Sequence, residues 1–200
     1  MEKYKYIYGA SVQGIQGFIF STNSLKDIVG GSELVEKICT SLFSSRYLQG
    51  ATQIIGAAGN IKCVYDDPVK CQKTVLEFPK TVMQEAPGIT ISQAVVKVTE
   101  EEFKNHFSQC MDELEKKLKI QRNKPSKSMT VGYMGVERSR STGLPATQME
   151  QQEFLDEGTY QKRKLSMGGE ATISLTEKSL GINELSPKNI AKKKKKLTEK

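Results

Sequence analysis

The segment Gln13–Leu34 constrains the fold most, because it joins the exit of a strand to an amphipathic repeat and a glycine pair. It follows Tyr4–Ala10, whose aromatic and β-branched residues are typical of a strand. Apolar residues then recur at helical spacing from Ile15 to Thr22 and predict a short helix. The chain therefore begins as a strand that leads directly into helical structure.

The pair Gly30-Gly31 is expected to break the chain between two helices. Ser32 is a favourable N-cap, so a second helix is predicted from there to about Leu48. Free backbone N–H groups at such a helix start could receive a phosphate, although the P-loop lysine is missing. Gly30, Gly31 and Ser32 are therefore candidate nucleotide-facing residues, and a simple helix break is the alternative.

Turn and cap residues divide the rest of the chain into alternating strands and helices. Asp67-Pro68 predicts a helix start, with Pro79 bending or splitting the helix that follows. The β-branched run Ile89–Val98 is expected to be a central strand. The remaining elements expected are a hairpin of Ala51–Gly56 and Ile61–Tyr65 with its tip at Ala57–Asn60, helices over Val69–Ala86 and Glu100–Gln121, and a strand over Ser128–Val136.

The order of these elements predicts an α+β protein. Its core is β-α-β-β-α-β, the ferredoxin-like plan that polymerase-palm and nucleotidyl-cyclase domains also use, with an extra helix after the first strand. We expect an antiparallel-rich sheet with helices mostly on one face. Three regions are predicted: a palm-like domain at 1–136, an irregular extension packed on it at 137–186, and a basic linker or tail at 187–200.

The opening motif resembles a known family. A V-Q-x-F-I-like segment, then a D and a G-S before a helix, opens the palm-like domains of the large subunit of type III CRISPR effector complexes, the CRISPR polymerase/cyclase family. Gln16–Leu34 carries this motif, and the order of elements over 4–136 agrees with it. The stretch Thr142–Ala146 is similar to a T-G-L-P-A segment that follows the first palm-like domain in relatives. No cysteine flanks it here, so no zinc is expected.

The resemblance implies where catalytic metals would lie and that this chain lacks their ligands. Catalytic relatives hold two divalent metals with an acidic residue at the end of the first strand and with acids at the hairpin tip. Here the tip is Ala57–Asn60, and Gly9–Gln13 contains no carboxylate. We therefore expect no catalytic and no metal-binding residue, because Mg²⁺ requires hard, preferably charged, oxygen ligands. Ser11, Gln13, Gly59 and Asn60 become candidate nucleotide- or partner-facing residues.

A degenerate first palm-like half is thus the function that the resemblance implies. Such a half would support a nucleotide pocket shared with a catalytic second palm-like domain, or with a second copy of itself, in antiviral defence. Mg²⁺ with ATP is expected only in the catalytic partner, and no cofactor is expected for this chain. Weak self-association through the face around Gly9–Gln13 is expected when the partner is absent. The alternative is a stand-alone ferredoxin-like regulatory module that binds a small nucleotide or a protein, and a third possibility is an active transferase with unusual ligands.

Charge and composition limit the partners and the location that this chain is expected to have. Residues 1–120 carry 14 basic and 14 acidic side chains, so the whole excess of +7 lies after residue 120, with five lysines in Lys192–Lys196. No aromatic residue is interleaved with these lysines, so the tail suggests nucleic-acid binding only weakly and favours a solvated linker. The four cysteines form no C-x-x-C pair, and no apolar run approaches the ~18 residues of a membrane span. A cytoplasmic protein without a membrane partner is expected.

Overall fold

The computed structural model describes residues 2–124 and 135–167. The predicted strand Ser128–Val136 falls almost entirely outside the described residues, and so do the tail 187–200 and the end of the extension. The elements, in chain order, are β1 (Tyr4–Gln13), α1 (Ile15–Ile19), α2 (Leu25–Lys37), a π-helical turn (Ile38–Leu42), α3 (Phe43–Tyr47), β2 (Ala51–Ala57), β3 (Asn60–Tyr65), α4 (Pro68–Glu85), β4 (Thr90–Thr99), α5 (Glu100–Asn105), α6 (Phe107–Arg122), β5 (Gln148–Glu150), β6 (Glu153–Leu155) and α7 (Glu157–Met167).

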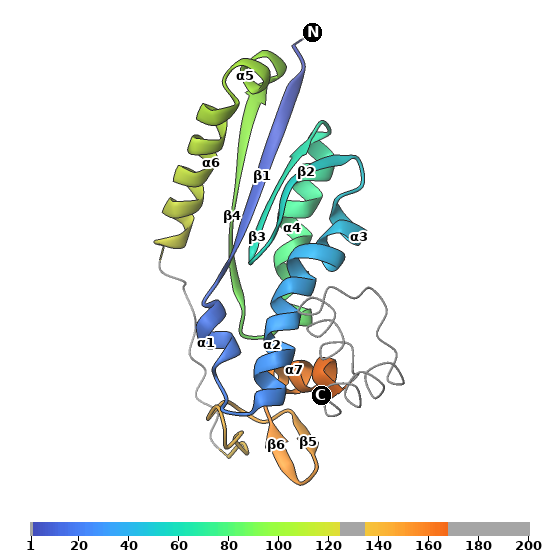
Figure 1. Cartoon of the computed structure of the whole chain (residues 1–200), viewed down its shortest axis with the longest axis vertical. Coiled ribbons are helices and arrows are strands. Elements are labelled where there is room, and N and C mark those ends of the chain that lie inside the picture. The colour runs from blue at the N-terminus through green and yellow to red at the C-terminus, as the bar shows by residue number, and fades with distance from the viewer. Residues whose placement is uncertain (1, 125–134, 168–200) are drawn as a thin grey trace, which may run out of the picture.

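A four-stranded antiparallel sheet in the order β2-β3-β1-β4 forms the centre of the molecule (Figure 1). This is the strand order of the ferredoxin-like β-α-β-β-α-β plan, so the predicted α+β palm-like core is confirmed. Within the described residues, β4 lies at an edge of the sheet. The prediction that Ile89–Val98 forms a central strand is therefore wrong for this sheet. Its β-branched sequence has another cause: α4 packs against one face of β4 and α6 against the other.

Helices cover both faces of the sheet. Tyr8, Phe43 and Phe78 are fully buried between the sheet and α2–α4, and the ring centroids of Phe43 and Phe78 are 5.1 Å apart. On the other face, α6 buries Leu114 and Leu118 against β1 and β4. Most helices therefore lie on one face, as expected, and α6 covers the other. Burial of each such side chain contributes roughly 1.5–3 kcal/mol, and α6 uses this to cover the second face.

The β2–β3 hairpin and α4 form where the turn and cap residues predicted them. Ala58 and Gly59 both have positive φ, 51° and 79°, as a two-residue hairpin turn of type I′ requires. Asp67 caps α4 through a hydrogen bond in which the Val69 N–H donates to its carboxylate. Pro79 lies inside α4 without splitting it.

The glycine pair Gly30-Gly31 does not end a helix. Both residues lie within α2, and Ser32 is not an N-cap, because its hydroxyl donates to the Ile28 carbonyl one turn earlier. The reason is tertiary: a Cβ at Gly30 would overlap with the carbonyl of Lys162 in α7. The missing side chain lets two helices that are distant in sequence touch.

α7 is attached to the N-terminal half through buried charged groups. The Lys162 ammonium is 1% exposed and donates to the Phe18 carbonyl and, at 2.8 Å, to the Ser21 hydroxyl. Burial lowers the pKa of Lys162. The neighbouring Arg163 donates to both carboxylate oxygens of Asp27, at 3.1 and 3.2 Å, and this contact raises its pKa. α7 thus packs on α2 and contacts α1 through Lys162, at the end of the molecule where the β5–β6 hairpin also lies (Figure 1).

Candidate functional site: the polar end of the sheet

The candidate site lies where β1 ends beside the β2–β3 hairpin. Register pairs Ser11 with Asn60 on β3 and with Ser92 on β4, and it pairs Gln13 with Thr90. Alternate β1 residues from Ile7 onward face α6. Because side chains alternate along a strand, Ser11 and Gln13 belong to that same face. The apolar floor under α6 therefore becomes polar toward this end of the sheet.

Ser11 is at the centre of this polar end and is 6% exposed. The Arg122 guanidinium, at the end of α6, donates to the Ser11 hydroxyl at 3.5 Å. The Gln13 amide donates to the Ser11 carbonyl at 3.4 Å. Asn60 is exposed, and its amide donates to the Ala58 carbonyl at 3.3 Å. A guanidinium and two amides thus surround one strand end.

The hairpin tip is held against β1 and α1. The Val12 N–H donates to the Gly59 carbonyl at 2.7 Å, which continues the β1–β3 pairing to the tip. Any Cβ at Gly59 would press on the Cδ1 of Ile15 in α1, and the positive φ also favours glycine there. Gly59 therefore shapes the site through its backbone.

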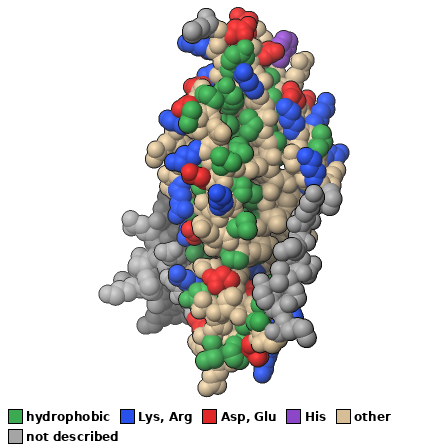
Figure 2. Space-filling view, turned by 180° about the vertical axis from the view of Figure 1, so that it is seen from behind, with side chains coloured by type: hydrophobic (Ala, Val, Ile, Leu, Met, Phe, Trp, Pro, Cys, Tyr) green, Lys and Arg blue, Asp and Glu red, His purple; other side chains and the backbone are tan. Residues whose placement is uncertain are grey.

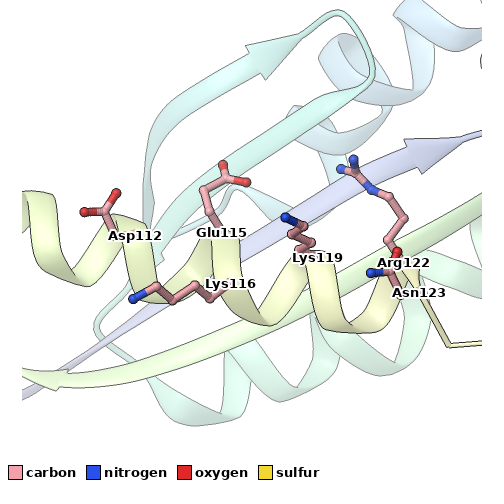
Figure 3. A pocket seen from close by; sticks show the side chains of 6 residues that line it. All are labelled: Asp112, Glu115, Lys116, Lys119, Arg122 and Asn123. Atoms are coloured by element: carbon pink, nitrogen blue, oxygen red, sulfur yellow. The ribbon is translucent and has the colours of Figure 1, made fainter.

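A shallow groove of about 450 Å³ along α6 continues from this end (Figure 3). Its lining consists of Asp112, Glu115, Lys116, Lys119, Arg122 and Asn123. Figure 3 shows Glu115, Lys119 and Arg122 along the same side of the helix. Glu115 is paired with Lys62 of β3, so Lys119 and Arg122 supply the charge nearest the strand end. Lys119 and Arg122 therefore place positive charge at the end of the groove that lies nearest the polar end of the sheet.

The chemistry available here is anion binding. Neither the end of β1 nor the hairpin tip carries a carboxylate, and the nearest acid in the groove, Glu115, is neutralised by Lys62. Among residues 2–124 and 135–167, no group of three His, Cys, Asp or Glu side chains could hold a metal ion. A guanidinium and a lysine beside hydroxyl and amide groups are the partners that a phosphate takes in proteins.

The structure brings together only part of the predicted set of site residues. Ser11, Gln13, Gly59 and Asn60 lie at the polar end, whereas Gly30, Gly31 and Ser32 lie within α2 on the side of α1 and α7. Backbone N–H groups inside a helix are used by the helix itself, so the glycine pair provides no phosphate-binding helix start.

Sequence reasoning missed Arg122. It is a basic residue at the end of an amphipathic helix, which is common, and only the packing of α6 on the sheet places it beside Ser11, 111 positions earlier.

No helix in the described part of the chain is long and apolar enough to cross a membrane. The thiols of Cys39, Cys63 and Cys71 are buried, and burial raises the pKa of Cys63 to about 12, which makes it a poor nucleophile.

Comparison with known proteins identifies the fold. No protein-family model matches the chain, and no curated protein matches it in sequence. A crystal structure of the Csm1–Csm4 cassette in complex with cA4 contains a chain that matches with a TM-score of 0.51 and 19% identity, over 60% of this chain and 19% of that one. The Csm1–Csm4 subcomplex of the type III-A CRISPR-Csm interference complex matches with a TM-score of 0.49 and 19% identity, over the same shares of the two chains. The structural neighbours are thus chains of type III CRISPR assemblies, and this chain spans about a fifth of their length.

Proposed function

We propose that this chain is a palm-like domain without catalytic metals, which supports a nucleotide pocket shared with a second palm-like domain in a CRISPR-associated antiviral assembly. The observation that carries the proposal is the polar end of the sheet: Arg122 contacts Ser11 where a catalytic palm domain would carry metal-binding acids. Cations in place of carboxylates favour a role in holding phosphate over a role in activating it. Mg²⁺ and the reacting groups would then come from the partner domain.

Binding of a fluorescent ATP analogue to the full chain, without metal, tests the pocket. Arg122→Ala should weaken binding about tenfold, since one charge-assisted hydrogen bond contributes about 1.5–3 kcal/mol and part of it is replaced by water. Lys117→Ala is the matched control. It removes the same charge from α6, but Lys117 is paired with Glu113 at 2.9 Å and does not line the groove. Equal affinities for the two variants would contradict the proposed pocket.

Incubation of the chain with labelled ATP and Mg²⁺ or Mn²⁺ tests the absence of catalysis. We expect no cyclic or linear oligonucleotide product, because the metal ligands of a palm domain are missing. A product that disappears in Asn60→Ala would overturn the non-catalytic role. Tight nucleotide binding that is unchanged by an added palm-like domain with catalytic acids would favour the stand-alone regulatory module instead.

A further inference from the structure

The two edges of the sheet differ in how they are protected. β2, at one edge, has seven residues, and its pairing with β3 shifts between Gln53 and Ile55. β4, at the other edge, has ten residues and pairs with β1 in one unbroken register. Proteins usually protect a sheet edge with bulges, prolines or charges, because free backbone groups attract other strands. β4 has no bulge against β1 and no proline, and Lys97 is its only charged residue.

The register shows which backbone groups of β4 are free. The Glu100 N–H donates to the Lys3 carbonyl at 3.0 Å, and the Thr99 N–H turns away to the Glu102 carboxylate at 2.9 Å. Because neighbouring residues of a strand direct their backbone groups to opposite sides, odd-numbered β4 residues direct theirs away from β1. These are Ile91, Gln93, Val95 and Lys97. Within the residues that the structure describes, no strand pairs with this edge.

An apolar pocket of about 440 Å³ adjoins the start of this edge. Its walls include Pro79, Val82 and Met83 of α4, Pro87 and Ile89 of the following turn, and Ile91 of β4. Met83 is 68% exposed and Leu76, two turns earlier on the same side of α4, is 58% exposed. Figure 2 shows hydrophobic side chains following one another down the middle of the face opposite to the view of Figure 1.

We propose that the β4 edge binds an extended segment of a partner protein as an additional strand, with one apolar side chain in the pocket and acidic residues beside it. Addition of a strand draws affinity from main-chain hydrogen bonds and specificity from pockets for alternate side chains, and β4 offers both. Charge favours an acidic partner, because β4 carries Lys97 and no acid, and over 73–83 α4 exposes two lysines, Lys73 and Lys80, against one acid, Glu77. The pocket lies on the α4 face of the sheet, whereas Ser11 and Arg122 lie on the α6 face, so the proposal does not depend on the nucleotide pocket.

A synthetic peptide tests the proposal on the full chain. The probe is a fluorescein-labelled nonapeptide that alternates threonine with valine or leucine and carries glutamates at its ends. Saturation with this peptide should slow amide exchange of Ile91, Gln93, Val95 and Lys97 at least tenfold, as followed by NMR. The amides of Ser92, Ala94 and Val96 already face β1 and should change little. The same peptide with N-methylated alternate amides should not bind, because it cannot form the ladder.

Matched variants distinguish the contributions of the pocket and of the β4 edge to peptide binding from a general effect of charge. Met83→Glu should weaken peptide binding at least tenfold, whereas Gln84→Glu, an equal charge change at an exposed neighbour, should change it less than twofold. Lys97→Pro removes an outward N–H and should abolish binding, whereas Lys97→Thr keeps that group and should weaken binding only a few-fold. Thermal unfolding of each variant shows whether it is folded.

Three results would overturn the proposal. The first is equal binding of the N-methylated peptide. The second is protection of the four outward amides in the free protein that persists on dilution, since another part of this chain would then cover the edge. The third is protection that grows with protein concentration, since a second copy would then be the occupant.

Discussion

At the residue scale, Gly30 shows how a tertiary contact can override a local preference, because the predicted helix break at Gly30-Gly31 is wrong. Glycine is a poor helix former, so a pair of glycines favours a helix end. In the structure, α2 continues through both because the carbonyl of Lys162 occupies the space that a Cβ would need. The cost of glycine in a helix is offset by the contact between α2 and α7.

Gly30→Ala should therefore destabilise the protein by about 2 kcal/mol or more, since overpacking against backbone cannot be relieved by a side-chain rotation. Gly17→Ala is the control: Gly17 lies in α1 with open space where a methyl group would be added, and alanine there should stabilise the helix by up to about 1 kcal/mol. Urea unfolding of both variants measures the difference. If Gly30→Ala matched Gly17→Ala in stability, α7 would not pack on α2 in solution.

At the element scale, α7 depends on Asp156. Its carboxylate accepts from the Thr159 N–H at 3.1 Å and from the hydroxyls of Thr159 and Thr142 at 2.7 and 2.9 Å. Burial works to raise the pKa of Asp156, but these hydrogen bonds outweigh it, and the pKa lies below its ordinary value. Asp156 thus caps α7 and ties it to the loop that contains Thr142.

Asp156→Asn should destabilise the protein by about 1–3 kcal/mol at pH 7, because the amide NH₂ cannot accept the hydrogen bonds that one carboxylate oxygen accepts. A carboxyl whose folded-state pKa is lowered stabilises the fold above its unfolded pKa of about 3.9, and this stability is lost as the pH falls through the folded pKa. The difference in unfolding free energy between the variant and the unmodified protein should therefore shrink below about pH 4. Unfolding free energies from pH 7 down to pH 3 measure it, and a difference that stays constant would exclude this role for Asp156.

At the scale of the whole molecule, charge decides whether two copies of this chain can associate through the polar end of the sheet. Lys119 and Arg122 lie along one side of the groove, so two copies that met through this end would bring like charges together. Phosphates placed between the copies would remove this repulsion. Weak self-association through this face is therefore expected to require nucleotide.

Sedimentation at rising protein concentration tests this, with and without millimolar ATP. The sedimentation coefficient should rise only with ATP, and Asn60→Glu should prevent the rise, because a carboxylate beside Ser11 repels phosphate. Gln84→Glu changes the charge equally on an exposed position of α4 and should leave the rise intact. Association that needs no ATP, or that Asn60→Glu leaves unchanged, would count against pairing through the polar end.

Local chemistry was enough to predict much of the fold. Three elements are each specified by residues within a few positions, through β propensity, positive φ or a cap. They are the strand at Tyr4, the hairpin tip at Ala57–Asn60 and the helix after Asp67-Pro68. Their order predicts the ferredoxin-like core because antiparallel neighbours and short connections leave few alternatives. That Gly9–Gln13 and Ala57–Asn60 contain no carboxylate could also be read directly from the sequence.

Only the tertiary structure decided the features that depend on distant parts of the chain. It determined that Gly30 receives α7, that Arg122 reaches Ser11, and that β4 lies at an edge of the sheet formed by the described residues, with a helix on each face. Local sequence reports what a residue prefers, whereas contact across more than a hundred residues depends on which surfaces meet when the core packs. The sequence by itself therefore determined most of the elements and their order, and packing determined which side chains lie together at the polar end of the sheet.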